Sequence, residues 1–162
     1  MKLNQLLERL EYEVIQGSDE AEITTFINDS RKVEKGSAFV CISGAVVDGH
    51  DFVEEVAQKG AAAVIVEREV EAPEDMTVIR VADSRYALAL MSAAYFGYPA
   101  DKMKIIGITG TKGKTTTTYM IKSILEGVGH KVGLIGTIEA IIGDEKIPAA
   151  NTTPESYTCL LY

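Results

Sequence analysis

Two glycines, a lysine and a threonine between residues 110 and 115 form the stretch of this chain best suited to hold a phosphate. Gly110 and Gly113 can adopt backbone angles that other residues avoid, so that peptide N–H groups converge on an anion. Lys114 can reach the β- and γ-phosphates of a nucleotide, and the hydroxyl of Thr115 is placed to bind Mg²⁺. This spacing predicts a nucleotide-binding loop.

The segments on either side of the loop supply the context that a phosphate site needs. Residues 105–108 are a short apolar run typical of a buried parallel strand, and apolar residues recur at helical spacing from Met120 to Val128. A helix that starts at the loop turns its positive end toward the anion. The usual G-x-x-x-x-G-K-[ST] pattern needs glycine where Ile108 stands, so the loop is a compact variant. The alternative, a helix start with a solvated lysine, is less favoured because all the flanking elements occur in order.

Net charge and composition exclude several classes of function. The 162 residues carry a net charge of −8, which counts against a general binder of nucleic acid or of an anionic membrane. Residues 1–100 hold 9 Lys or Arg and 18 Asp or Glu, whereas residues 101–162 hold 7 and 6. Five lysines lie between residues 101 and 122, so the local positive excess surrounds the predicted phosphate loop.

The cysteines and the N-terminus indicate a cytoplasmic location. Cys41 lies in an apolar run and is expected to be a buried thiol, and Cys159 is too distant in sequence to suggest a disulfide framework. The first twelve residues carry charges throughout and lack a signal-peptide core, and no apolar run reaches membrane-spanning length.

Strands and helices alternate over the first hundred residues, as in an α/β fold. The predicted strands are residues 23–27, 38–42, 61–66 and 77–81, and the predicted helices begin near Leu3, at Asp51, and at Asp83 or Ser84. Gly97 and Pro99 end the last of these helices, at the point where the acidic balance also ends. We therefore predict a small α/β domain of residues 1–100 and a second part of residues 101–162.

The second part looks like the incomplete start of a P-loop-type ATPase domain. Residues 131–136 are predicted to form a second parallel strand, residues 137–142 and 145–147 a hairpin turning at Gly143-Asp144, and Pro154 suits the first turn of a last helix. Most of the helical cover that a parallel sheet needs is missing. We therefore expect exposed apolar surface on residues 102–162, met by self-association, docking or local disorder.

Three polar clusters have both a functional and a purely structural interpretation. Residues 28–31 (Asn-Asp-Ser-Arg) fit a ligand site at a strand end, but an Asx-type turn with a surface ion pair is favoured. Residues 48–51 (Asp-Gly-His-Asp) suit a polar ligand and a turn with a helix cap equally well. Residues 151–153 (Asn-Thr-Thr) suit an anion or a sugar, although a helix cap alone explains them. His50 and His130 are too isolated to propose as metal ligands or bases.

Together these pieces are more specific than each is alone. The loop from Gly110 to Thr116 resembles that of the Mur ligase family of ATP-dependent amide-bond synthetases. Four stretches that begin at Asp29, Gly36, Asp48 and Gly60 look like the N-terminal substrate domain of two of its members. The run Asn-Thr-Thr-Pro-Glu at residues 151–155 resembles the member that adds the third residue of the peptidoglycan stem peptide. The resemblance covers essentially the whole chain.

The resemblance implies a role for particular residues. Ser30 would contact the uridine-diphosphate part of the substrate, and Asn151, Thr152 and Thr153 would hold its muramoyl-dipeptide end. The loop at Ala45-Val46-Val47 lies where the family also meets the nucleotide, but it is apolar here and only backbone contacts are expected. The ATP-binding residues would be Gly110, Thr111, Lys112, Gly113, Lys114, Thr115 and Thr116, with Lys114 as the catalytic residue and Thr115 as the Mg²⁺ ligand.

The resemblance also implies the reaction. ATP with Mg²⁺ would phosphorylate a carboxylate of UDP-N-acetylmuramoyl-dipeptide, and the amino group of an amino acid, diaminopimelate or lysine, would attack the acyl phosphate. The chain is short for this family, so we expect that these 162 residues fold but are inactive alone. Two alternatives stay open: the sister ligase that adds D-Ala-D-Ala, and a stand-alone nucleotide-binding module.

Overall fold

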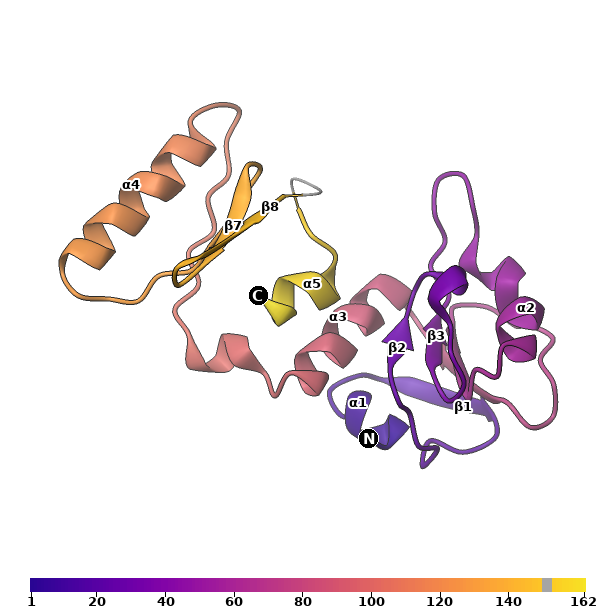
Figure 1. Ribbon diagram of the computed structural model, residues 1–162. Coiled ribbons are helices and arrows are strands. Elements are labelled where there is room, and N and C mark those ends of the chain that lie inside the picture. The colour runs from indigo at the N-terminus through magenta and orange to yellow at the C-terminus, as the bar shows by residue number, and fades with distance from the viewer. Residues whose placement is uncertain (150–152) are drawn as a thin grey trace. The chain divides into compact units, whose positions relative to one another are not determined.

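A five-stranded sheet organises residues 1–97 (Figure 1). The computed structural model describes residues 1–149 and 153–162 and divides into two units, Met1–Gly97 and Tyr98–Tyr162. The strands of the first unit are β1 (Tyr12–Gln16), β2 (Phe26–Ile27), β3 (Ala38–Val40), β4 (Ala63–Val66) and β5 (Thr77–Val81), in the order β1-β5-β4-β3-β2. Strands β2 to β5 pair in parallel, and β1 joins the edge of β5 in the antiparallel direction.

Helices cover both faces of this sheet, as buried parallel strands require (Figure 1). The helices of the first unit are α1 (Leu3–Leu6), α2 (Val53–Gln58) and α3 (Ser84–Tyr95), with short 3-10 turns η1 (Ser30–Lys32) and η2 (Gly49–Phe52). Phe39 and Val64 pack in one cluster with Val56 of α2. Side chains alternate along a strand, so Ala38 and Val40 lie on the opposite face, where they are also fully buried. There α1 and α3, which contact each other, provide the cover.

The α/β fold class is confirmed in this unit, with differences at the edges of elements. Strand β5 has the predicted bounds, and β3 and β4 are shorter than predicted. Asp83 caps α3 by accepting a hydrogen bond from the main-chain N–H of Tyr86. The first helix ends at Leu6, and the edge strand β1 was not predicted because its Tyr-Glu-Val-Ile-Gln sequence has no clean alternation and three exposed residues.

The second unit is built around an antiparallel sheet and one long helix. Its elements are η3 (Pro99–Lys102), α4 (Lys114–Gly127), β6 (Leu134–Ile135), β7 (Glu139–Ile142), β8 (Glu145–Pro148) and α5 (Ser156–Leu161). The strands follow the order β6-β7-β8, and both pairs are antiparallel. The predicted hairpin is confirmed as β7 and β8, with Gly143 at φ +59° in the turn between them.

Two strand predictions in this unit are wrong. Residues 105–108 form no strand, and the side chain of Ile105 is 70% exposed. Only Leu134–Ile135 of the predicted strand 131–136 is extended and paired, and its partner β7 runs antiparallel. An apolar run becomes a parallel strand only where a neighbour takes up its peptide groups. Neither segment has a parallel neighbour among the residues that the structure describes.

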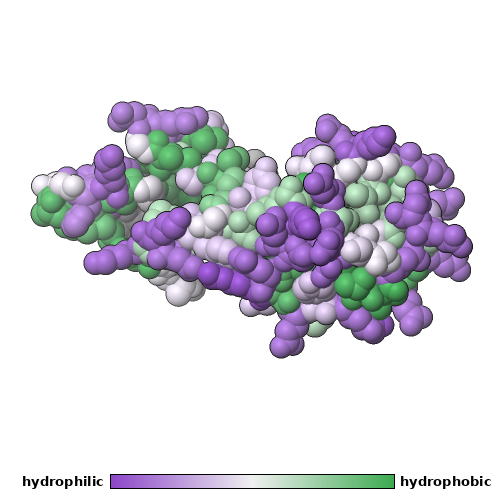
Figure 2. Space-filling view, turned by 90° about the horizontal axis from the view of Figure 1, so that it is seen from below, coloured by the Kyte–Doolittle hydropathy of each residue, from purple (hydrophilic) through white to green (hydrophobic). Residues whose placement is uncertain are grey.

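Exposed apolar surface on the second unit is confirmed. None of the α4 side chains is buried. The large apolar residues left exposed in this unit are Met103, Ile105, Ile106, Met120, Ile124, Val128, Ile135, Ile138 and Leu161. Apolar side chains are visible among polar ones on the molecular surface in Figure 2. Hydrophobic burial therefore contributes much less to this unit than to the first one.

Amide hydrogen exchange will separate a paired strand from an unpaired apolar run. We expect the amides of Ile105 and Ile106 to exchange at nearly the rate of an unfolded chain, because they donate to no strand in the described structure. The amide of Ile65, in the middle of the parallel sheet, provides the matched protected control. Protection of Ile105 equal to that of Ile65 would contradict the structure of this segment.

Candidate functional site

The loop from Gly110 to Gly113 has a backbone that only glycine adopts readily at two of its positions. Gly110 has φ +146° and Gly113 has φ +78°. Gly113 is also the N-cap of α4, and no side chain caps this helix. The first N–H groups of α4 are therefore left for water or a ligand, at the end of the helix where the dipole favours an anion.

Lys114 lies across this loop. Its ammonium Nζ donates a hydrogen bond to the carbonyl oxygen of Gly110 at 2.6 Å, which closes the loop on itself. Thr115 is half-buried at the first turn of α4, and its carbonyl accepts a hydrogen bond from the hydroxyl of Thr118 at 2.7 Å. The seven predicted nucleotide-binding residues thus form one continuous, mostly exposed segment, in which the ammonium group of Lys114 is bound to a carbonyl of the loop.

A polar contact ties α4 to the hairpin. The hydroxyl of Tyr119 donates to Glu139 Oε1 at 2.7 Å, and this hydrogen bond to a carboxylate raises the pKa of the tyrosine. Lys146 Nζ lies 4.0 Å from the same oxygen. Since α4 buries no side chain, this contact from α4 to β7 is part of what positions the helix that carries the phosphate loop.

A second candidate site is the edge of the first sheet where the parallel strands end. In open α/β sheets, ligands bind outside the carboxyl ends of the strands. The segments that leave this edge begin after Ile27, Val40, Val66 and Val81. Because β2, β3, β4 and β5 are neighbours, the polar residues that follow them gather along one edge although they are far apart in sequence.

Ser30 follows β2 and starts the turn η1. Asp29 caps this turn by accepting from the N–H of Arg31 at 3.2 Å, and the Arg31 guanidinium binds both oxygens of Asp29 at 2.8 and 2.9 Å. The hydrogen bond from the Arg31 side chain lowers the pKa of Asp29 to about 2. The Asx-type turn with an ion pair is therefore confirmed for Asp29 and Arg31.

Lys59, at the end of α2, holds the main chain of Ser30 from the other side. Its Nζ donates to the carbonyl oxygen of Ser30 at 2.8 Å and to Glu55 Oε1 at 2.6 Å. The sequence did not indicate this contact, because it joins residues 29 positions apart. The half-buried Ser30 is thus held through its carbonyl oxygen.

Asp48 and His50 follow β3 and form a polar pair in which His50 is buried and Asp48 is half-buried. His50 Nδ1 lies 2.6 Å from Asp48 Oδ1, and Asp48 also accepts from the main-chain N–H of His50 at 3.0 Å. These hydrogen bonds from His50 hold the pKa of Asp48 well below its usual range. Asp48 is the cap of η2, whereas Asp51, the predicted cap, lies inside that turn.

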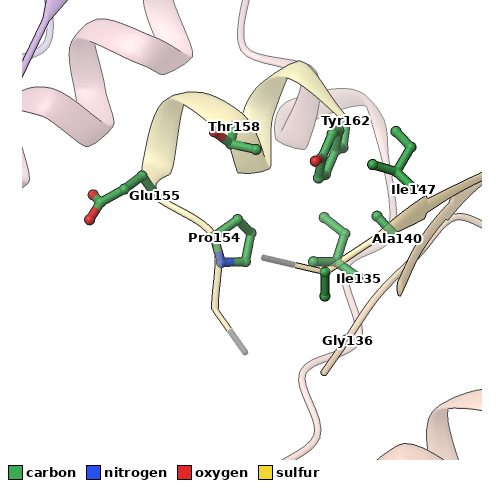
Figure 3. A pocket seen from close by; sticks show the side chains of 9 residues that line it. Ile135, Gly136, Ala140, Ile147, Pro154, Glu155, Thr158 and Tyr162 are labelled. Atoms are coloured by element: carbon green, nitrogen blue, oxygen red, sulfur yellow. The ribbon is translucent and has the colours of Figure 1, made fainter. Parts of the chain in front are cut away.

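The remaining predicted substrate residues lie near the end of the chain. Asn151 and Thr152 fall outside the described residues, and Thr153 is exposed before α5. Beside α5 there is a mostly apolar pocket of about 120 Å³ (Figure 3). Its lining residues are Ile135, Gly136, Ala140, Ile147, Ala149, Pro154, Glu155, Thr158 and Tyr162. Of the predicted site residues that the structure describes, none lines this pocket.

The described ranges 1–149 and 153–162 contain no group of three or more His, Cys, Asp or Glu side chains arranged to hold a metal ion. No helix among them has the length and apolar character needed to cross a membrane. Cys41 is a buried thiol, as predicted, and burial raises its pKa to about 12, so it is not an activated nucleophile.

Two protein families match consecutive parts of the chain. Residues 12–98 match the Mur ligase family, catalytic domain, and residues 108–162 match the Mur ligase middle domain. The chain is 54% identical over 157 residues to a UDP-N-acetylmuramoyl-L-alanyl-D-glutamate–2,6-diaminopimelate ligase of Clostridium perfringens, covering 97% of this chain and 32% of the relative. The ligase of the same name from Bacillus velezensis is 48% identical over 159 residues, covering 98% and 32%. The chain thus spans about a third of the length of these relatives.

Solved structures show a related fold. A structure of a UDP-N-acetylmuramoyl-L-alanyl-D-glutamate–2,6-diaminopimelate ligase superimposes with a TM-score of 0.70 and 25% identity, over 99% of this chain and 32% of that one. A crystal structure of MurF from Acinetobacter baumannii gives a TM-score of 0.56 and 32% identity, over 83% and 30%.

The ion pair at Asp29 can be tested by titration. Because its pKa is lowered to about 2, the stabilisation it gives is present above the ordinary carboxyl pKa near 3.8 and is lost as the pH falls through 2. Arg31→Ala should return the titration midpoint of Asp29 toward 3.8, followed by carboxyl ¹³C NMR. Lys32→Ala is the matched control, because Lys32 Nζ is 3.9 Å from Asp29 Oδ2 and should shift the midpoint less. An Asp29 midpoint near 3.8 in the unaltered chain would contradict the ion pair.

Proposed function

This chain belongs to the Mur ligase family, and from that premise we propose that it carries the UDP-substrate and ATP-binding parts of the ligase that adds diaminopimelate to UDP-N-acetylmuramoyl-L-alanyl-D-glutamate. The observation that carries the proposal is the 54% identity over 157 residues to a relative of that name. Since the chain spans about a third of that relative, ligation is proposed for the whole protein and binding for these residues.

The phosphate loop fits a nucleotide with Mg²⁺. Gly110 and Gly113 have the positive φ angles that a phosphate-binding loop uses, and an added Cβ at Gly113 would meet no atom within 4 Å. Lys114 would exchange the carbonyl of Gly110 for phosphate oxygens, and Thr115 would bind Mg²⁺. When bound, the nucleotide supplies the phosphoryl group that activates a carboxylate for amide formation.

The uridine-diphosphate part of the substrate would bind at the carboxyl edge of the first sheet. Ser30 follows β2 there; Lys59 donates to its carbonyl oxygen, and Asp29 caps the turn that Ser30 begins. Asn151, Thr152 and Thr153 would meet the muramoyl-dipeptide end. In this division of labour the protein positions reactants and neutralises charge, so no side-chain nucleophile is needed.

Ser30 is tested by binding of UDP-N-acetylmuramoyl-L-alanyl-D-glutamate in isothermal titration. Loss of one hydrogen bond in Ser30→Ala should weaken binding by about 0.5–1.5 kcal/mol, roughly 2- to 13-fold. Ser18→Ala is the matched control. The main-chain N–H of Ser18 donates to the hydroxyl of Thr77, the first residue of β5, so Ser18 lies at the opposite edge of the sheet. Equal affinity of Ser30→Ala and the unaltered chain would remove Ser30 from the site.

The same titration discriminates between the two ligases. The corresponding UDP-tripeptide, the substrate expected for a ligase that adds D-Ala-D-Ala, should bind more weakly than the dipeptide. Tighter binding of the tripeptide would favour that sister activity. Binding of ATP with Mg²⁺ but of neither UDP compound would indicate a nucleotide-binding module instead.

Lys114 is tested by titration with ATP and Mg²⁺. A hydrogen bond between charged groups contributes about 1.5–3 kcal/mol, so Lys114→Ala should weaken binding by roughly ten- to a hundredfold. Lys114 is exposed, so the circular dichroism spectrum of the Lys114→Ala variant should match that of the unaltered chain. Lys112→Ala, two residues away in the loop, is the control for a general loss of positive charge and should have the smaller effect. The assignment fails if both variants bind ATP equally well.

A further inference from the structure

We propose that His50 is a positioning residue for the substrate site: as a neutral imidazole protonated on Nδ1, it holds the loop of residues 43–48 at the carboxyl edge of the first sheet. This inference rests on the proposed function, because the loop has a substrate to meet only if the uridine-diphosphate part binds at that edge. It concerns a residue to which neither the motif nor the fold assigned a role.

The hydrogen bonds of His50 determine its protonation. Its side chain is only 1% exposed, and Nε2 lies 3.0 Å from the main-chain nitrogen of Glu67. A main-chain N–H can only donate, so Nε2 is the acceptor and carries no proton. The ring proton therefore lies on Nδ1 and points to Asp48 Oδ1 at 2.6 Å. His50 thus links the segment after β3 to the end of β4.

Asp48 connects His50 to the loop of residues 43–48 by hydrogen bonds. Besides His50, its Oδ1 accepts from the hydroxyl of Ser43 at 3.2 Å, and its Oδ2 accepts from the guanidinium of Arg68 at 3.1 Å. Ser43 and Asp48 also form an isolated antiparallel bridge, and the N–H of Gly44 donates to the carbonyl of Val47 at 2.9 Å. The carboxylate of Asp48, oriented by His50, therefore closes the base of the loop.

The tip of the loop is exposed, whereas its base is hydrogen-bonded. Val46 is 95% exposed, and the main-chain N–H groups of Ala45 and Val46 donate to no described residue. At the base of the loop the chain at Gly49 passes close to the main chain of Ile42. A Cβ at position 49 would lie 2.6 Å from the nitrogen of Ile42, so only glycine fits there. An apolar tip with free peptide groups offers a ligand backbone hydrogen bonds and an apolar contact.

The position of the loop favours the substrate of the first unit as its ligand. It leaves β3, which pairs directly with β2, the strand that leads to Ser30. Both segments therefore emerge side by side at the edge where ligands of open α/β sheets bind. No contact of His50 with the substrate is needed, because its effect is transmitted through Asp48 to the peptide groups of the loop.

The experiment compares variants at position 50 by titration with two ligands, UDP-N-acetylmuramoyl-L-alanyl-D-glutamate and ATP with Mg²⁺. His50→Leu removes both ring contacts and should weaken binding of the UDP compound at least tenfold while ATP affinity stays unchanged. His50→Gln keeps an acceptor for the N–H of Glu67 and should recover part of the lost affinity. A merely structural role would not produce this recovery together with a loss confined to one ligand.

Two positions outside the core, the exposed Ser43 and the half-buried Asp48, keep the test decisive if a variant of the buried histidine fails to fold. Ser43→Ala and Asp48→Asn act on the same chain of contacts from the loop side and should weaken binding of the UDP compound severalfold. Asp51→Asn is the matched control, because its carboxylate contacts Arg68 at 3.5 Å and does not bond to the loop. The nitrogen-15 spectrum of His50 should show a proton on Nδ1 and none on Nε2.

The outcomes separate this inference from the proposed function. If the unaltered chain does not bind the UDP compound, the proposed function fails and this inference falls with it. If the unaltered chain binds but Asp48→Asn and His50→Leu bind equally well, only the inference is overturned. A proton on Nε2 of His50 overturns it independently of any ligand.

Discussion

A parallel strand is stable only where strands on its sides take up its peptide groups and helices cover its faces, and most of this structure follows from that requirement. The first unit meets it: β3 and β4 have neighbours on both sides and are buried along their whole length. The segment 105–108 has an equally apolar sequence but no neighbour among the described strands, and it stays exposed. The same kind of sequence thus gives a core strand in one unit and an open segment in the other.

The two candidate sites depend on this constraint to different degrees. The edge site exists because neighbouring parallel strands deliver Ser30, Asp48 and Glu67 to one side of the sheet. The phosphate loop needs only two glycines with positive φ and the start of a helix, which are local features. The loop is therefore formed even though the strand before it is not, whereas the edge site would disappear with its sheet.

Local patterns in the sequence predicted much of the fold. The bounds of β5, the Asp83 cap of α3 and the β7–β8 hairpin depend on neighbouring residues and are confirmed. The apolar run at residues 131–136 predicted a parallel strand, whereas β6 pairs antiparallel with β7. An apolar run indicates a preference for strand structure but does not identify the neighbouring strand. The contacts of His50 with Glu67 and of Lys59 with Ser30 could not be predicted, since they join distant segments that only the folded sheet brings together. The assigned site residues themselves stay a proposal.

The hydrogen bond from Lys114 to the carbonyl of Gly110 would have a kinetic consequence for phosphate binding in the proposed nucleotide loop. A lysine in open solvent would present its full charge to any passing anion, whereas this one already has an internal ligand. A phosphate would have to displace that carbonyl, so breaking this hydrogen bond would reduce the net free energy of binding. Weakly charged anions would therefore bind poorly. When the phosphate leaves, the carbonyl would accept the ammonium again, which would shorten the residence time of a product. In the proposed nucleotide loop, this exchange would favour polyphosphates over singly charged anions and would speed product release.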